Sequence, residues 1–212
     1  MKVLLIILLL VYAIGATRPP RIDVEDHPVQ EHDSIGKFVE LKEHQTIIFK
    51  CSGPHDDLEF KFPDMSDHKG YNEVTYLNRV EEVNDDDLGD RVLTITNVQQ
   101  SDTGAYSCIS LEQSSLNDTI YVFVHGENTF IPSIIAMLSY GDEDVMVPCR
   151  TTMFVDKNDI ELYADGQLIK NAMKNYDHRF GYKIDKNIYD EKLSDTRFEC
   201  KYKKEPNQRV FS

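Results

Sequence analysis

The sequence predicts an all-β protein made of two β-sandwiches in tandem, and three observations support this. Short stretches such as Ile47 to Cys51 alternate apolar and polar residues, the period of a strand with one face in a core. The four cysteines fall into two pairs of similar spacing along the chain. Alternating stretches lead into Cys51 and Cys149, the first cysteine of each pair, so each half is expected to have its own core and its own disulfide.

The most specific motif lies at residues 102–108, Asp-Thr-Gly-Ala-Tyr-Ser-Cys. In an immunoglobulin sandwich, a tyrosine two residues before the second cysteine turns its hydroxyl back onto the preceding corner. Tyr106 and Cys108 have that spacing, and Cys51 is the expected disulfide partner. The chain has no tryptophan to pack against this disulfide, and we expect Phe60 to take that place.

The second half repeats the arrangement in a divergent form. In an exported chain, of the three possible connectivities, pairing Cys149 with Cys200 suits two sequential domains. Leu162 stands in the tryptophan place, and Phe198 stands in the tyrosine place without a hydroxyl. Residues 165–166, Asp-Gly, predict a hairpin turn. A zinc site is disfavoured, because no closely spaced pair of cysteine and histidine is present.

Residues 1–16 have the charge, apolar run and small residues of a signal peptide. Residues 17–37 are rich in proline and acids and predict an extended segment. We place the first immunoglobulin-like domain at 38–125 and the second at 126–212. The last strand of the second domain is expected to be truncated to a stub. Such an unfinished sheet edge would leave the domain marginal or completed by another chain.

Charge and motifs exclude several function classes. The formal net charge of −14, or −15 once Lys2 leaves with the leader, argues against nucleic acid, whose phosphates need basic partners. After the leader no apolar stretch is long enough to span a membrane, so a secreted, extracellular chain is expected. Kinase and serine-hydrolase motifs are missing and the histidines lack metal-ligand spacing, which predicts no enzyme, cofactor or metal. His178 is interpreted as structural rather than catalytic.

Two surface features allow a functional and a plain interpretation. Residues 81–90 gather acidic side chains without the liganding rhythm of a calcium loop, which favours a solvated loop. Asn117 begins the sequon Asn-Asp-Thr, and we expect it to be glycosylated and to face solvent. The acidic charge would steer a basic partner, but it also fits a merely soluble exported protein.

Several stretches resemble the receptors for platelet-derived and vascular endothelial growth factors. Residues 58–63, Leu-Glu-Phe-Lys-Phe-Pro, resemble the first domain of the vascular endothelial receptors, with phenylalanines where tryptophans stand. Residues 131–137 resemble the opening of the family's second domain, and residues 147–151 resemble its disulfide strand. Residues 176–182 resemble a loop of the platelet-derived receptors. The chain therefore resembles the two N-terminal domains of a divergent, invertebrate-like member of this family without its kinase part, over residues 38–204.

In that family the second and third domains hold a cystine-knot growth factor through an apolar patch. By position, the resemblance implies that Ile131 and Pro132 contact the ligand, with Phe130 and Ile134 beside them. Tyr163, next to the core position Leu162, is expected to point outward and extend the patch. The alternative is that Phe130, Ile131 and Ile134 pack between the two domains.

The resemblance thus implies a secreted growth-factor-binding protein, acting as a decoy or a truncated receptor. The expected partner is a cystine-knot growth factor of the platelet-derived or vascular endothelial type. A two-fold ligand could draw two copies of the chain together. The alternative function is a secreted adhesion or immune-recognition protein that binds through its loops or by pairing of strands.

Overall fold

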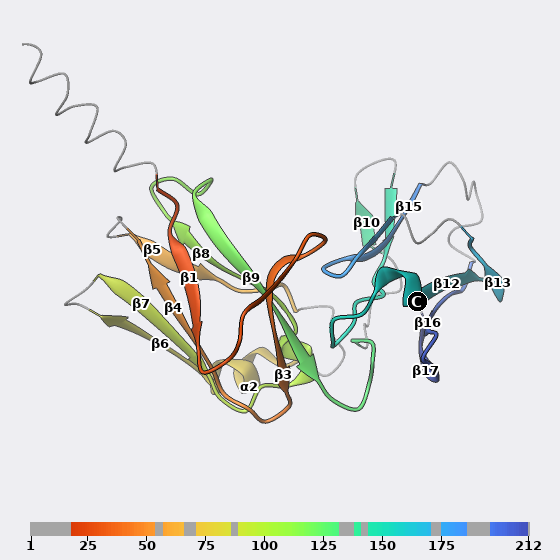
Figure 1. Cartoon of the computed structure of the whole chain (residues 1–212), viewed down its shortest axis with the longest axis horizontal. Coiled ribbons are helices and arrows are strands. Elements are labelled where there is room, and N and C mark those ends of the chain that lie inside the picture. The colour runs from red at the N-terminus through yellow and green to blue at the C-terminus, as the bar shows by residue number, and fades with distance from the viewer. Residues whose placement is uncertain are drawn as a thin grey trace, which may run out of the picture.

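The computed structural model describes residues 18–53, 57–65, 71–85, 89–131, 138–140, 144–170, 175–185 and 196–211. These residues form two β-rich bodies in series (Figure 1). Each body contains two sheets with a buried apolar cluster and its own disulfide. The all-β prediction of two immunoglobulin-like sandwiches is confirmed. The leader at 1–16 lies outside the described residues.

The first sandwich packs a four-stranded sheet against a five-stranded one. In spatial order, the first sheet contains β1 (Arg21–Glu25), β4 (Ile47–Ser52), β7 (Asp90–Ile95) and β6 (Val80–Asp85). The second sheet contains β2 (Gln30–His32), β3 (Gly36–Lys42), β9 (Asn117–His125), β8 (Gly104–Ser110) and β5 (Leu58–Lys61). Helix α2 (Glu73–Leu77) and the 3-10 turn η1 (Gln100–Asp102) complete this body.

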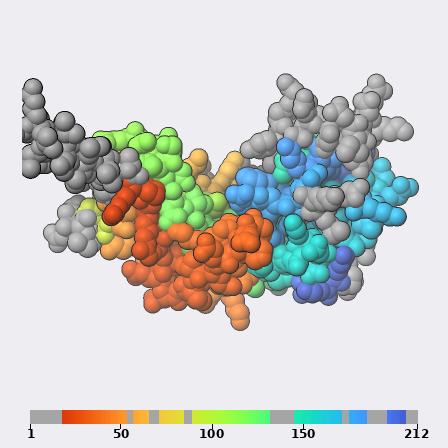
Figure 2. All heavy atoms as spheres, turned by 45° about the horizontal axis from the view of Figure 1, so that its top comes forward, coloured from red at the N-terminus to blue at the C-terminus, as the bar shows by residue number. Residues whose placement is uncertain are grey.

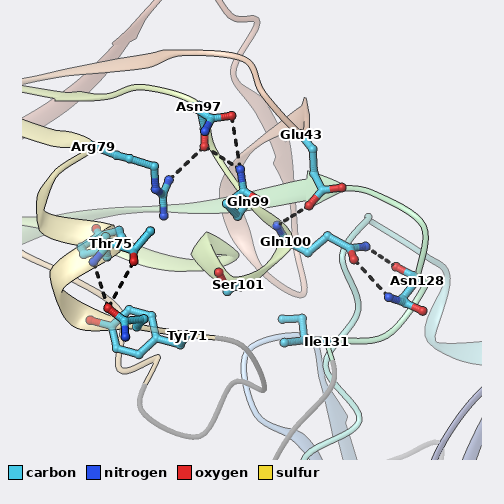
Figure 3. Close-up of a pocket in the computed structure, with 12 residues that line it drawn as sticks. Glu43, Tyr71, Thr75, Arg79, Asn97, Gln99, Gln100, Ser101, Asn128 and Ile131 are labelled. Atoms are coloured by element: carbon cyan, nitrogen blue, oxygen red, sulfur yellow. Dashed lines mark hydrogen bonds between the residues drawn. The ribbon is translucent and has the colours of Figure 1, made fainter.

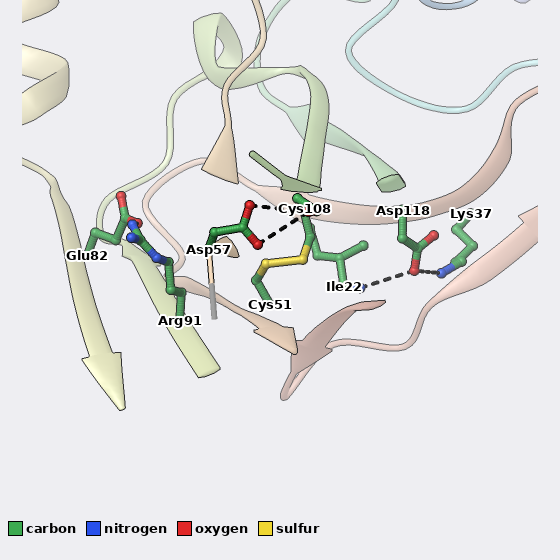
Figure 4. Close-up of a disulfide and its surroundings, with 9 residues drawn as sticks. Ile22, Lys37, Cys51, Asp57, Glu82, Arg91, Cys108 and Asp118 are labelled. Atoms are coloured by element: carbon green, nitrogen blue, oxygen red, sulfur yellow. Dashed lines mark hydrogen bonds and ion pairs between the residues drawn. A yellow bond between two sulfur atoms is a disulfide. The ribbon is translucent and has the colours of Figure 1, made fainter. Parts of the chain in front are cut away.

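The expected strand patterns hold in the core of this sandwich. Cys51 and Cys108 are bridged with a Cα–Cα distance of 5.5 Å (Figure 4). Phe60 pairs in register with Cys108 and is 4% exposed, so it fills the tryptophan place as expected. Tyr106 donates its hydroxyl to the Asp102 carbonyl at 2.9 Å, which is the predicted corner bond. Gly104 lies against the Pro63 ring, where an added Cβ would overlap that ring.

The segment at 17–37 differs from the prediction, because two strands form within it. β1 pairs with β4 over five residues, and β2 pairs with β3. The Ile22 backbone N–H also donates to the Asp118 carboxylate at 3.1 Å, and Lys37 pairs with the same carboxylate (Figure 4). The first sandwich therefore begins near Arg21, ahead of the predicted start at residue 38.

The acidic stretch at 81–90 is also not simply a loop. Strands β6 and β7 form a hairpin from Val80 to Ile95, with Asp85 opposite Asp90. Lys50 pairs with Asp90 at 2.8 Å and Arg91 with Glu82 at 2.9 Å, so neighbouring strands balance part of the charge. An edge strand that is exposed to solvent can pair through its backbone without alternating apolar residues. The acidic sequence at 81–90 therefore gave no sign of strand β6.

The second sandwich packs two four-stranded sheets. In spatial order, one contains β10 (Leu138–Tyr140), β11 (Asp144–Val147), β15 (Gly181–Asp185) and β14 (Tyr176–Asp177). The other contains β13 (Gln167–Leu168), β12 (Ile160–Ala164), β16 (Phe198–Tyr202) and β17 (Glu205–Phe211). The 3-10 turn η2 (Lys157–Asp159) precedes β12.

The second sandwich has the predicted disulfide, but its last strand differs from the prediction. Cys149 and Cys200 are bridged, and Leu162 pairs in register with Cys200. Asp165 and Gly166 have φ of 49° and 79°, the left-handed pair that a two-residue hairpin turn requires. The last strand is no stub, because β17 has seven residues and pairs with β16. The expectation of an unfinished sheet is therefore wrong.

The sandwiches meet through a cluster of aromatic rings. Phe154 of the second stacks on Phe38 of the first, with ring centroids 4.9 Å apart, and lies near Phe123 and His32. His178 packs edge to face on Phe123 at 6.0 Å. In Figure 2 the orange surface of the first sandwich lies against the cyan surface near residue 150. We call Phe38, Phe123, Phe154 and His178 the joint cluster.

Candidate functional site

Phe130 and Ile131, two of the expected ligand contacts, are buried. Phe130 bridges to Thr151 and belongs to the second core at 3% exposure, and Ile131 is 1% exposed. The Ile131 N–H donates to the Arg150 carbonyl at 2.9 Å, which pairs this segment with the chain after Cys149. Both side chains are therefore buried, but Phe130 packs in the core of the second sandwich and not between the two domains. Pro132 and Ile134 lie outside the described residues.

Ile131 forms part of the wall of a polar cavity of about 490 Å³ (Figure 3). The other walls come from α2, from the turn before β8 and from the linker between the sandwiches. Tyr71 and Arg79 lie on the side of α2, and Gln100 and Asn128 lie on the side of the linker.

On the linker side of this cavity, polar groups pair with one another. Gln100 donates its side-chain amide to the Asn128 carbonyl at 2.7 Å and accepts from the Asn128 amide at 3.2 Å. The Glu43 carboxylate accepts from the Gln100 backbone N–H at 3.2 Å. This arrangement fixes the linker to the first sandwich.

Tyr163 lies on the outer face of the second sandwich, as expected. Its neighbour on that face, Leu168, was not among the predicted site residues. Leu168 stands directly opposite Tyr163 across the β12–β13 hairpin, so both side chains share one face of the sheet. Leu168 is 43% exposed and Tyr163 is half-buried. The two-residue Asp-Gly turn sets this register, and that signal could have predicted the pair.

Charged side chains surround this pair. Lys201 of β16 places its ammonium 4.0 Å from the centre of the Tyr163 ring and pairs with Glu199 at 3.1 Å. The Tyr163 hydroxyl donates to Glu161 at 2.9 Å, and this bond raises the pKa of the phenol. We call Glu161, Tyr163, Leu168, Glu199 and Lys201 the outer-face patch.

A small crevice of about 280 Å³ opens at the same sheet edge. Its lining includes Ile160 and Leu162, which are fully buried core residues, and Leu168, which also belongs to the outer-face patch. Ile160 and Leu162 alternate with Tyr163 along β12 and therefore point to the opposite side of the strand. Leu168 and Glu161 line the crevice and also belong to the outer-face patch, so they connect the two.

The remaining predicted residues occupy separate places. Asn117 begins β9 and is exposed, so its side chain is accessible for the expected glycan. His178 is 3% exposed in the joint cluster, and its Nδ1 has no hydrogen-bond partner among the described residues. In the described part of the chain, no group of three or more histidine, cysteine, aspartate or glutamate side chains could hold a metal ion.

Arg79 and Asp102 form a buried ion pair that sequence reasoning missed. The Arg79 guanidinium donates to both Asp102 oxygens, at 2.6 and 2.9 Å. Asp102 also accepts from the Gln99 backbone N–H at 2.8 Å. The motif at 102–108 includes the aspartate, but no local pattern indicates which cation it meets.

Comparison with known proteins finds similarity to part of a receptor. The chain is 56% identical over 208 residues to the tyrosine-protein kinase receptor ver-3 of Caenorhabditis elegans, a match that covers 97% of the chain. The chain spans only 17% of the length of that receptor. No protein-family model matches. Among the residues that the structure describes, no helix is long and apolar enough to cross a bilayer.

A solved structure, the first immunoglobulin domain of the mouse polymeric immunoglobulin receptor, is similar to part of this chain. The match covers 52% of this chain and 98% of the mouse domain. Its TM-score is 0.35 and its identity 18%. The fold of the present chain rests on its own strand pairing and disulfides. The parallel pairing of β3 with β9, together with the Tyr106 corner, places the first half among immunoglobulin-like sandwiches.

Proposed function

We propose that this chain is a secreted, receptor-like protein that captures a cystine-knot growth factor of the platelet-derived or vascular endothelial type. The observation that carries the proposal is the 56% identity to a tyrosine-protein kinase receptor over 97% of the chain. Two sandwiches joined by a packed aromatic cluster suit a protein that presents a binding surface. The chain would act as a soluble competitor of the longer receptor.

The outer-face patch of the second sandwich is the surface that we assign to the ligand. Phe130 and Ile131 are buried, so their side chains cannot supply the contact without rearrangement. Tyr163 and Leu168 offer a partly exposed apolar centre within a rim that carries both signs of charge. Protein interfaces typically have such a centre, in which a few aromatic and aliphatic side chains carry most of the affinity.

The test measures binding of purified cystine-knot dimers of both growth-factor types to the immobilised chain. We expect Tyr163→Ala to weaken binding of the captured dimer by about 30-fold or more, the loss typical of a central aromatic residue. Leu168→Asp should weaken it similarly, because the change puts a charge at the centre of the interface.

Leu77→Asp is the matched control for Leu168→Asp. Leu77 is also an exposed leucine, at 58% exposure, but it lies on α2 of the first sandwich, away from the patch. It should leave binding unchanged. Failure of the wild-type chain to bind any dimer of either type would contradict the growth-factor function and favour adhesion. Binding that Tyr163→Ala leaves intact would show that the ligand uses another surface.

A further inference from the structure

The imidazole of His178 is enclosed by rings from both sandwiches. It lies 5.0 Å from Phe154 and 5.1 Å from Tyr176 in its own sandwich, and 6.0 Å from Phe123 on β9 of the other. The Tyr121 hydroxyl, also on β9, donates to the His178 carbonyl at 3.3 Å. The same residue therefore contacts the first sandwich through both its ring and its backbone.

This environment suits the neutral ring and disfavours the charged one. The buried Nδ1 has no hydrogen-bond partner among the described residues, and the packed rings exclude water. Burial lowers the pKa of His178 from 6.5 to about 4, despite the opposing charges of Asp177 and Asp156. Opening the joint would return the ring to water and so restore its ordinary affinity for protons.

The charged groups around His178 do not remove this cost. Hydrogen bonds from Arg179 lower the pKa of Asp177 despite its burial, so much of its charge is already paired with the guanidinium. Asp156 precedes η2 and is occupied by the Asn158 N–H at 2.8 Å. From the first sandwich, His32 faces the same cluster, and its positive charge would oppose a proton on His178.

One carboxylate on the joint remains charged in mild acid. Glu40 of β3 accepts from His125 at 3.0 Å and from the Phe154 backbone N–H at 2.9 Å. The hydrogen bond from His125 is the main cause that holds the pKa of Glu40 below its ordinary value. Down to about pH 5 this carboxylate therefore keeps its charge, and its contact with Phe154 does not drive opening in that range.

We propose that the joint cluster is an acid-sensitive latch, in which a proton on His178 separates the two sandwiches and frees their relative orientation. The device extends beyond ligand capture, because it does not depend on which surface holds a ligand. Acid favours the open joint, since only there does His178 bind a proton near pH 6. Proton linkage with these two pKa values increases the open-to-closed ratio about 25-fold between pH 7.4 and pH 5.0.

Tryptophan fluorescence can report the latch, because the natural chain has no tryptophan. Phe154→Trp places the single indole against Phe38 and His178 in the joint. We expect a blue-shifted emission, protected from acrylamide, at pH 7.4. At pH 5.0 the emission should move to the red and become accessible to acrylamide. Small-angle X-ray scattering of the wild-type chain should show a larger radius of gyration at the lower pH.

His178→Phe keeps an aromatic ring that cannot titrate, and should remain closed at both pH values by fluorescence and by scattering. His44→Asn changes an exposed histidine in the turn between β3 and β4, and should open as the wild type does. Asparagine tolerates the positive φ of 72° at that site. Circular dichroism verifies that each variant is folded, and His178→Leu replaces His178→Phe if the latter is not.

Two results would overturn the latch. One is an acid response that persists unchanged in the folded, non-titrating variant, because another group would then cause the opening. The other is a wild-type chain whose fluorescence reporter and radius of gyration stay constant from pH 7.4 to pH 4.5.

Discussion

The two sandwiches share a fold and a disulfide position but differ in how polar groups support the core. In the first, the Tyr106 hydroxyl bonds to a carbonyl four residues earlier, beside the buried pair of Arg79 and Asp102. In the second, Phe198 holds the tyrosine position without a hydroxyl. There, Tyr182 of β15 donates to the Ile160 carbonyl of β12 at 2.9 Å and so connects the two sheets.

This difference shows that the disulfide and the apolar alternation define the sandwich. The buried tyrosine that hydrogen-bonds within the core can stand at different positions in the chain. A buried hydroxyl needs an acceptor, but the acceptor need not be local in sequence. The first sandwich supports one corner, whereas the second links its two sheets. Both arrangements satisfy a tyrosine hydroxyl inside a core closed by a disulfide.

The largest expected effect tests whether the first sandwich depends on its ion pair. Asp102→Ala should lower the free energy of unfolding by about 3–5 kcal/mol, because it leaves a largely buried Arg79 without its carboxylate. Hydrogen exchange measured by mass spectrometry would assign the loss to the first sandwich. The matched change in the second, Asp159→Ala, removes an ion pair with the exposed Lys204 and should cost clearly less. Equal losses would contradict the proposed asymmetry.

An intermediate effect compares the two hydroxyl bonds directly. Tyr106→Phe and Tyr182→Phe should each lower stability by about 1–3 kcal/mol, because each leaves a buried carbonyl without a donor. Chemical denaturation of both variants measures the losses, and hydrogen exchange locates them. A neutral Tyr182→Phe would show that the bond between the sheets adds nothing to the second sandwich.

The smallest expected effect concerns the contact between the sandwiches. Glu40→Gln should cost at most about 1 kcal/mol at pH 7, because the carboxylate is 29% exposed and its His125 partner 39%. Because folding lowers the pKa of Glu40, the carboxylate stabilises the folded chain above its ordinary pKa of 4.5. This stabilisation is lost as the pH falls through the lowered pKa of the folded chain. Thermal melts of both proteins should therefore converge in acid. A difference that grows below pH 4 would contradict this sign.

Local signals predicted much of the fold. The alternation around the cysteines and the Asp-Gly turn each fix structure over a few residues, and the cysteine spacing indicates which distant strands are bridged. All three predictions were confirmed. Strands β2 and β17 escaped prediction because they lie in polar or proline-containing sequence, where backbone pairing rather than side-chain pattern selects the strand. β1 does alternate apolar and polar residues and buries Ile22, but the neighbouring prolines and acids concealed this short pattern. For the candidate site, Tyr163 was found by counting along β12, whereas Leu168 required the register of the hairpin.

By itself, the sequence determined two β-sandwiches with aromatic and aliphatic cores, each with its own disulfide, since the apolar period and the cysteine spacing can both be read along the chain. Only the tertiary structure decided that Phe130 and Ile131 face inward and that Arg79 meets Asp102. It also decided that Phe38, Phe123, Phe154 and His178 form a joint. The physical reason is that burial and ion pairing depend on which distant segments pack together, and no local pattern in this chain encodes that choice.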